Sequence, residues 1–291
     1  MAEQVVQFRG VTFNGNLTGS GDIYMLYDIP EGLSHPQVRE SEQQKQGQHG
    51  IIDQISYYGK RLITLTGRIV SDSESGRVAM ENALKAIFRL DGVQANVNAS
   101  YYDLTITDEA GVSRVASVKI VDGITFSKEV GLSNVREFIV TLKARDPRFF
   151  GSVLNSEDLS EAIDGTDFRL PTLLPVTISP DIIYDEILNN GGNFSTPTII
   201  TLTGESTNPR IINQTTGVTC KLNTTISGAE VVVIDSELGT IEKDGVDISS
   251  SLDNSSKFIH LDAGDNLIEC RDDTPTATDL VINIKWKDAY V

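Results

Sequence analysis

The stretch from Phe138 to Phe150, FIVTLKARDPRFF, marks the point where the character of the chain changes. Apolar side chains recur at every second residue from Phe138 to Ala144, which predicts a strand with one buried face. Asp146-Pro147 ends this strand, because proline has no N–H for a sheet and restricts the residue before it. We therefore expect the stretch to be the closing strand of one module.

Three charged residues surround that proline. Arg145, Asp146 and Arg148 lie within four positions and are followed by two phenylalanines. Oppositely charged groups this close in sequence predict an ion-paired strand end. We interpret Arg145, Asp146, Pro147 and Arg148 as a structural hinge between two modules rather than as a binding site.

The two halves of the chain differ in charge. Residues 1–150 contain 18 acids and 16 bases, whereas residues 151–291 contain 23 acids and 8 bases, within a total net charge of −17. The second half therefore favours basic partners or cations and repels nucleic acid, so no sequence-specific nucleic-acid binding is expected. The chain has no apolar run near the ~18 residues of a membrane helix, and its start has no secretory h-region, so we expect no membrane insertion and assembly in a cytoplasm.

The periodicities predict a mainly β protein with one helix. The first half alternates in the stretches 5–13, 23–29, 51–69, 93–107, 115–121, 124–127 and 137–145, while Arg77–Leu90 has apolar residues at helical spacing, with Arg77 and Glu81 expected on its outer face. Ser73 or Ser75 can cap this helix. These features predict an α+β domain resembling a β-sandwich over residues 1–152.

The second half shows short strands only. After a proline-containing connector at 153–180, turn signals recur about every ten residues, which is typical of a jelly-roll β-sandwich and predicts a domain over 181–291. The expected strands are 182–188, 198–203, 210–213, 219–222, 230–235, 240–243, 246–248, 256–261, 266–271 and 280–286.

No catalytic, cofactor or metal site is expected. The three histidines, His35, His49 and His260, are far apart, and no nucleophile elbow or phosphate loop accompanies them. Cys220 and Cys270 have no CxxC spacing, and we expect both to be free and buried, although a disulfide between neighbouring strands stays open. The sequence therefore predicts a protein that is not an enzyme.

A long polar segment interrupts the first module. Residues Pro30 to Gly50 are too many for an ordinary connection, so the segment is either mobile or an arm ordered by a partner. The candidate oligomer-arm residues are Pro36, Arg39, Gln43, Gln44, Gln46 and Gln48.

Several motifs occur together along the chain, in a fixed order. In the first half these are Pro36-x-Val38-Arg39, Gly47-x-x-Gly50, Tyr58-x-x-Arg61-x-Ile63-x-Leu65-x-Gly67-x-Ile69, the helix at 77–90, and Ala144-Arg145-Asp146-Pro147-Arg148-Phe149. In the second half they are Asn190-Gly191-Gly192-Asn193 with Pro197, Asn208-Pro209-x-Ile211-x-Asn213-x-Thr215-Thr216-Gly217, Val233-Ile234-Asp235-Ser236 with Gly239, and Leu261-x-x-Gly264-x-Asn266. This set resembles the distal tail protein family of long-tailed, siphovirus-type bacteriophages, often called Dit.

The resemblance implies a structural protein of the virion tail tip or baseplate. It implies a homo-oligomeric ring, a hexamer, in which the N-terminal domain lies at the distal end of the tail tube and its long loop clasps the neighbouring subunit. It also implies a C-terminal galectin-like domain that serves as an adaptor. The implied partners are the tail tube protein, a tail hub or tail-associated protein, and a receptor-binding or side-fibre protein, which gives the protein a role in host attachment.

A different reading stays open for the second half. The triplet Asn208-Pro209-Arg210 with Asn213 is similar to the sugar-binding strand of galectins, and the chain has one tryptophan, Trp286. The alternative function is a carbohydrate-binding module that recognises a host cell-wall glycan. No histidine precedes the triplet within reach, which argues against that alternative.

Overall fold

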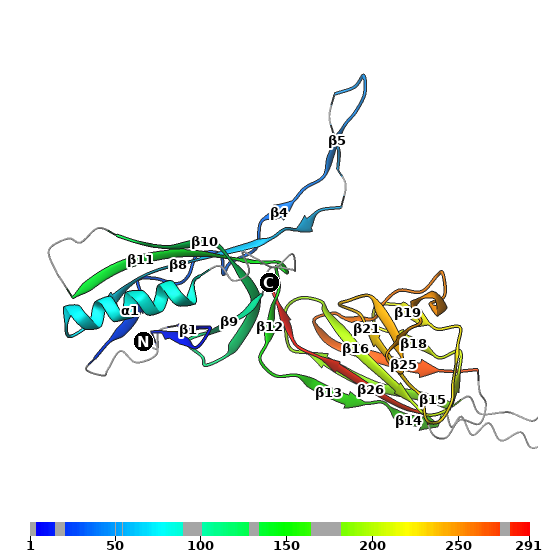
Figure 1. Cartoon of the computed structure of the whole chain (residues 1–291). Coiled ribbons are helices and arrows are strands. Elements are labelled where there is room, and N and C mark those ends of the chain that lie inside the picture. Colours follow the sequence, from blue (N-terminus) through cyan, green and yellow to red (C-terminus); the bar gives the residue numbers. More distant parts are fainter. Residues whose placement is uncertain are drawn as a thin grey trace, which may run out of the picture. The chain divides into compact units, whose positions relative to one another are not determined.

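The computed structural model describes residues 4–14, 21–49, 51–53, 55–89, 101–127, 134–163, 182–273 and 280–291. The chain divides into two compact units, Met1–Ser152 with Val291, and Val153–Tyr290. Strands make up most of both units (Figure 1). The described helices include none that is long and apolar enough to cross a membrane.

The first unit contains a twisted antiparallel sheet, one helix and a separate ribbon (Figure 1). The sheet has the order β2-β1-β9-β10-β11-β8-β3, with β12 added on β10. Its elements are β1 (Val5–Phe8), β2 (Val11–Phe13), β3 (Ile23–Leu26), β8 (Arg61–Val70), α1 (Glu74–Ile87), β9 (Tyr102–Thr107), β10 (Ser113–Phe126), β11 (Val135–Ala144) and β12 (Phe149–Gly151). The ribbon is formed by β4 (Val38–Arg39), β5 (Glu42–Gln44), β6 (Ile51–Asp53) and β7 (Tyr57–Tyr58).

Two of the predicted strand boundaries in the first unit differ from those in the structure. The expected strand at 5–13 is two strands, because Arg9 and Gly10 adopt left-handed backbone with φ of 46° and 83° and form a tight turn. Conversely, the segments 115–121 and 124–127 belong to the single strand β10. The break between these two segments, at Asp122-Gly123, coincides with register shifts against β11 between Ile120 and Thr125.

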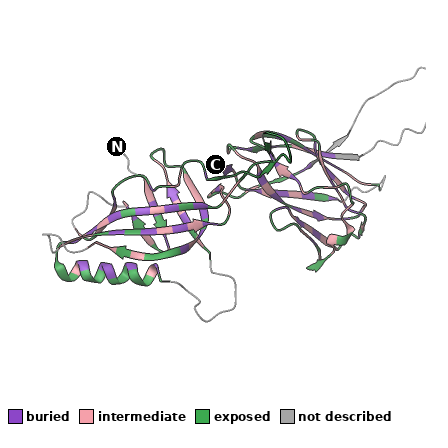
Figure 2. Cartoon of the chain, turned by 90° about the horizontal axis from the view of Figure 1, so that it is seen from above, coloured by how far each residue is buried: buried purple, intermediate pink, exposed green. Residues whose placement is uncertain are grey.

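The helix covers the core of the first unit. Ser73 caps it by accepting a hydrogen bond from the Gly76 N–H, so the helix begins at Glu74, three residues before the expected start. Met80 and Leu84 are buried, and Phe88, the residue that ends the helix, stacks on Phe8 with ring centroids 5.2 Å apart. Figure 2 shows the buried stripe of α1 and the alternating burial along the strands.

The expected outward positions of two helix residues are wrong. Arg77 and Glu81 are both buried. The helical period places them beside the apolar stripe rather than on the opposite, solvent-facing side. Burial is possible because they form an ion pair with each other, and because Arg136 of β11 and Lys85 lie 3.7 Å and 3.8 Å from the same Glu81 carboxylate. Charged groups tolerate burial when they are paired in this way.

The second unit is a β-sandwich of two antiparallel sheets. One has the order β13-β26-β16-β21-β22-β23 with β24 beside β16, and the other the order β14-β15-β25-β18-β19. The strands are β13 (Asn155–Asp158), β14 (Ser160–Ile163), β15 (Ile182–Asn190), β16 (Thr196–Thr203), β17 (Ser206–Thr207), β18 (Arg210–Asn213), β19 (Val218–Lys221), β20 (Thr225–Ile226), β21 (Val231–Asp235), β22 (Thr240–Lys243), β23 (Val246–Asp247), β24 (His260–Leu261), β25 (Gly264–Arg271), β26 (Val281–Trp286) and β27 (Ala289–Tyr290). One apolar cluster, with members from both sheets such as Ile200, Ile211 and Ile284, fills the space between them.

Part of the expected connector at 153–180 is strand. β13 pairs with β26 from Asn155↔Trp286 to Asp158↔Asn283, and β14 pairs with β15. Both strands therefore extend the sheets of the second unit. The sequence did not predict β13, because its side chains are polar and mostly exposed. A strand of this kind at a sheet edge shows no apolar alternation.

The two cysteines are free and buried, as expected. Both lie directly opposite Ile211, Cys220 from β19 and Cys270 from β25, so a whole strand separates them. Two strand spacings are about 9.5 Å, whereas a disulfide spans about 4.4–6.8 Å between Cα atoms. This geometry excludes a disulfide in the folded unit.

Burial raises the pKa of the Cys220 thiol to about 11 and also raises the pKa of Cys270. Both thiols therefore stay protonated and unreactive at neutral pH, since the thiolate is the nucleophile. We expect neither cysteine to react with an aromatic disulfide reagent at pH 8 until a denaturant unfolds the second unit. Rapid reaction of either thiol in the native protein would contradict this arrangement.

Candidate functional site

The ribbon of the first unit is the main candidate for a functional site. It is a two-stranded arm in which β4 pairs with β7, β5 pairs with β6, and the tip lies between Gln44 and Ile51 (Figure 1). Gln43 and Gln44 lie opposite Ile52 and Ile51, and Gln46 and Gln48 belong to the tip. The structure thus brings Arg39 and the four glutamines together on one hairpin, whereas Pro36 precedes it.

The arm exposes apolar side chains. Every described residue from 37 to 49 is exposed, and so are Ile51, Ile55 and Tyr57, with Ile55 73% exposed. A two-stranded hairpin without a sheet or helix against it is marginally stable in water, and its free edges can pair with other chains. The arm therefore has the properties of a segment that packs against a partner.

The base of the arm is fixed to the sheet by backbone contacts. Glu31 and Thr64 exchange two backbone hydrogen bonds of 3.1 Å, and the Gly59 N–H donates to the Gln37 carbonyl at 2.7 Å. Gly32 has φ +88°, and a Cβ at this position would lie 1.8 Å from the Leu62 carbonyl oxygen, so only glycine fits. Pro36 differs from the other arm residues because it is buried.

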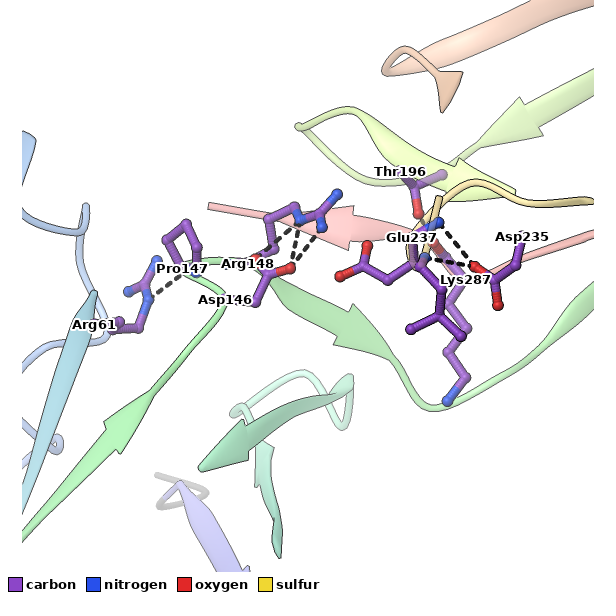
Figure 3. Close-up of polar contacts among 9 residues, drawn as sticks. Arg61, Asp146, Pro147, Arg148, Thr196, Asp235, Glu237 and Lys287 are labelled. Atoms are coloured by element: carbon purple, nitrogen blue, oxygen red, sulfur yellow. Dashed lines mark hydrogen bonds and ion pairs between the residues drawn. The ribbon is translucent and has the colours of Figure 1, made fainter. Parts of the chain in front are cut away.

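Arg61 is the side chain that links this base to the end of β11. Its Nε donates to the Pro147 carbonyl at 2.8 Å (Figure 3). Its Nη1 donates to the Gly32 carbonyl at 2.7 Å and to the Ser34 carbonyl. The guanidinium lies over the Phe149 ring, 4.5 Å from its centroid, and only 1% of Arg61 is exposed. Burial lowers the pKa of Arg61 from its usual high value, yet an arginine stays charged in proteins.

The alternation of residues in β8 indicates that the Arg61 side chain is buried. Arg61 is in phase with Ile63, Leu65 and Gly67 along β8, so the alternation places a charged residue on the buried face. A buried arginine needs several acceptors. Only the folded chain shows that three backbone carbonyls accept from Nε and Nη1, and that Nη2 has no hydrogen-bond partner within the described residues.

The strand end around Asp146 is ion-paired in part. Arg148 donates from Nε to Asp146 Oδ1 at 2.9 Å and from Nη2 to Oδ2 at 2.5 Å, and its backbone N–H donates to Oδ1 at 2.8 Å (Figure 3). Pro147 contributes the carbonyl that Arg61 binds. Arg145 is exposed and takes no part in these contacts.

The residues similar to a galectin sugar site have structural contacts instead. Asn213 is fully buried and donates to the His260 carbonyl and to Asn266 Oδ1, while its own Oδ1 accepts from two backbone N–H groups. Trp286 is 5% exposed, and its indole N–H donates to the Asn189 carbonyl. Among the described residues of this unit, the large hydrophobic side chains that are exposed are all aliphatic, and Trp286 is not among them.

The asparagine and glycine motifs of the second unit shape its turns. Asn190 donates to the carbonyls of Phe194 and Leu261, and Asn266 donates to those of Asp262 and Gly264. At Gly192 a Cβ would lie 1.9 Å from the Ala289 carbonyl oxygen. These positions specify the fold of the unit rather than a ligand site.

Residues 191–290 match the family model for the C-terminal domain of the siphovirus-type tail component, SPP1_Dit. The resemblance to the distal tail protein family is confirmed. Among solved structures, the chain is similar to the Dit protein of phage SPP1, with a TM-score of 0.65, 13% identity, and 99% of each chain covered. That structure is described as a paradigm of the hub adsorption apparatus of phages that infect Gram-positive bacteria.

A chain of the phage P2 baseplate in its activated conformation with Ca is also similar. It has 8% identity and a TM-score of 0.44, and the match covers 98% of this chain and 97% of that chain. No curated protein matches the chain. The family-model match supports a structural role in a phage tail. The likeness to the SPP1 protein shows a shared fold.

The first prediction for this site concerns Arg61. Arg61→Met should lower the free energy of unfolding by about 3 kcal/mol, because it leaves buried carbonyls without a donor. It should also increase hydrogen exchange at the base of the arm, at Gly32 and Ser34. Arg39→Met is the matched control, since Arg39 is exposed on the arm, and it should change neither quantity. Equal stability of the two variants would refute the anchoring role.

The second prediction concerns the strand end. Asp146→Ala should lower stability by roughly 1–2 kcal/mol, because it removes a partly exposed ion pair and a backbone hydrogen bond. Asp146→Asn keeps the acceptor for the Arg148 N–H and should lose less. Thermal unfolding of both variants tests this order. Unchanged stability and unchanged assembly in Asp146→Ala would count against a structural role for this end.

Proposed function

We propose that the protein forms a homo-oligomeric ring at the distal end of a phage tail tube and acts there as an adaptor of the tail tip or baseplate. In this proposal the first unit makes the ring, and the arm clasps the neighbouring copy. Six copies are the number that the family resemblance implies. The observation that carries the proposal is the exposed apolar arm on a firmly anchored base.

The charge distribution supports a ring formed by the first unit and an adaptor surface on the second unit. Residues 1–150 are nearly neutral, with 18 acids and 16 bases, so copies of the first unit can approach one another without a large repulsion. Residues 151–291 carry 23 acids against 8 bases, which suits a domain that is held apart from its copies. We infer that the second unit offers the surface for a hub protein and for a receptor-binding or side-fibre protein.

The proposal also gives Arg145, Asp146, Pro147 and Arg148 their role. They end the last long strand of the ring-forming unit, and the second unit begins five residues after Arg148. A paired strand end of this kind defines the direction in which the chain leaves a module. We propose that these residues form the hinge between the ring and the adaptor domain.

Size-exclusion chromatography with light scattering, followed by negative-stain microscopy, tests the ring. Wild-type protein should give a closed ring of about six copies at high concentration or with the tail tube protein. Ile55→Ser on the arm should weaken association by roughly tenfold to hundredfold, because one large aliphatic side chain no longer becomes buried. A wild-type protein that stays monomeric under both conditions would overturn the proposal.

Leu238→Ser provides a matched control. Leu238 is also 73% exposed, but it lies on the β21–β22 turn of the second unit. This variant should form the ring as wild type does. If both variants impaired association equally, the arm would not be the contact that the proposal requires.

A further inference from the structure

Three positively charged residues form a row across the outer face of one sheet of the second unit. Arg210 of β18 lies directly opposite Lys221 of β19 on one side and Arg271 of β25 on the other. The next residue of β18, Ile211, is fully buried, so this cation row faces away from the core. The row contains three of the eight basic residues between positions 151 and 291, and like charges opposed in this way destabilise a sheet.

The carboxylate of Glu269 compensates one end of the cation row. Glu269 is 7% exposed, forms an ion pair with Arg271 through Oε1, and accepts a hydrogen bond from Gln214 at Oε2, 2.5 Å away. Burial opposes its ionisation, but the hydrogen bonds from Arg271 and Gln214 lower its pKa, with a smaller contribution from the charge of Arg210. Both carboxylate oxygens are therefore already engaged.

The other two cations of the row have no such partner. Within the described residues, the half-buried guanidinium of Arg210 forms no hydrogen bond and no ion pair, and its Nε is buried without an acceptor. Lys221 lies outside ion-pair distance of the described carboxylates. It acts only at longer range on Asp253, whose carboxylate accepts two hydrogen bonds from Ser255.

One carboxylate can engage both Arg210 and Lys221. Residues directly opposite each other in an antiparallel pair have Cβ atoms about 5 Å apart, so both side chains can reach one anion. A guanidinium binds a carboxylate through two parallel hydrogen bonds, and a neighbouring ammonium adds a second positive charge. The pair therefore has the geometry of a site for an acidic group.

The surroundings favour an acidic group on a protein over a polyanion. Residues 151–291 carry 23 acids and 8 bases, so a chain of negative charges is repelled beyond the row. On the same outer face, Ile187 and Leu267 are register partners and are 61% and 38% exposed. A protein surface can cover such aliphatic side chains, place one acid at the row, and direct its basic residues at the surrounding acids.

We propose that Arg210 and Lys221 bind a carboxylate of the partner protein that the second unit holds, on the outer face of the sheet β14-β15-β25-β18-β19. The inference rests on the proposed adaptor function and names the surface that this function uses. A basic partner can meet an acidic unit in many orientations. A single acid that must reach Arg210 and Lys221 selects one of them, because every other orientation leaves like charges together.

Binding of the full-length protein to the purified hub protein and side-fibre protein of the same phage tests the site. Arg210→Met should weaken binding to the partner by about tenfold or more, as should Lys221→Glu, measured by calorimetry. Arg210→Met should leave the thermal unfolding of the protein unchanged, because Arg210 forms no bond within the described chain. An arginine with a structural role would lower the unfolding temperature instead.

Lys285→Glu is the matched control. Lys285 is also half-buried, but it lies on β26 of the opposite sheet, and the substitution changes the net charge by the same amount as Lys221→Glu. This variant should bind the partner as wild type does. In addition, a carbodiimide, which joins an amine to a carboxylate without a spacer, should link Lys221 to one acid of the partner. Changing that acid to lysine should restore binding to Lys221→Glu.

The outcomes separate this inference from the adaptor function. If neither partner protein binds wild type, the adaptor function fails, and the inference fails with it. If wild type binds and both Arg210→Met and Lys221→Glu bind equally well, the adaptor function stands and the site is wrong. Equal losses in Lys221→Glu and Lys285→Glu would show an effect of net charge and overturn the site. Binding of polyglutamate or polyphosphate that Lys221→Glu abolishes would show a polyanion site and overturn it as well.

Discussion

The contact on which the first unit depends is the buried guanidinium of Arg61. Burying a charged group to 1% exposure is costly unless it finds acceptors, and here Nε and Nη1 donate to carbonyls of two segments far apart in sequence. Gly32 and Ser34 begin the arm, and Pro147 follows the last long strand of the unit. One side chain thus holds the base of the arm and the exit of the chain in a fixed relation to the same sheet. The direction of the arm depends on this contact, because the arm itself has no core.

The strands and the helix could be predicted from the sequence because their signals are local. The alternation from Phe138 to Ala144 reappears as β11, and Thr240 to Lys243 forms a strand at the expected residues. The sequence-based prediction was wrong where the same local pattern is compatible with two structures. Arg77 and Glu81 were placed in solvent because charged residues usually lie there, but they neutralise each other inside the boundary of the core. The polar strand β13 had no apolar alternation to reveal it.

The candidate site was harder to predict than the fold, because it consists of pairings between distant segments. The length and polarity of residues 30–50 indicated an arm, and the structure adds that it is a hairpin with Gln44 opposite Ile51. The opposition of Arg210 and Lys221 could not be predicted, since a shift of one residue between β18 and β19 would separate them onto different faces. The strand register decides which side chains lie next to each other on the surface of a sheet. Apolar periodicity shows which face of a strand is buried, but it does not show which residues of two strands are paired.

The loops of the second unit are held by buried asparagine side chains. Its buried asparagines, Asn190, Asn213 and Asn266, saturate their amide groups with backbone partners at turns, so the loops are held without a large apolar surface. The arm of the first unit differs, because its exposed Ile51 and Ile55 pack against no core of the unit.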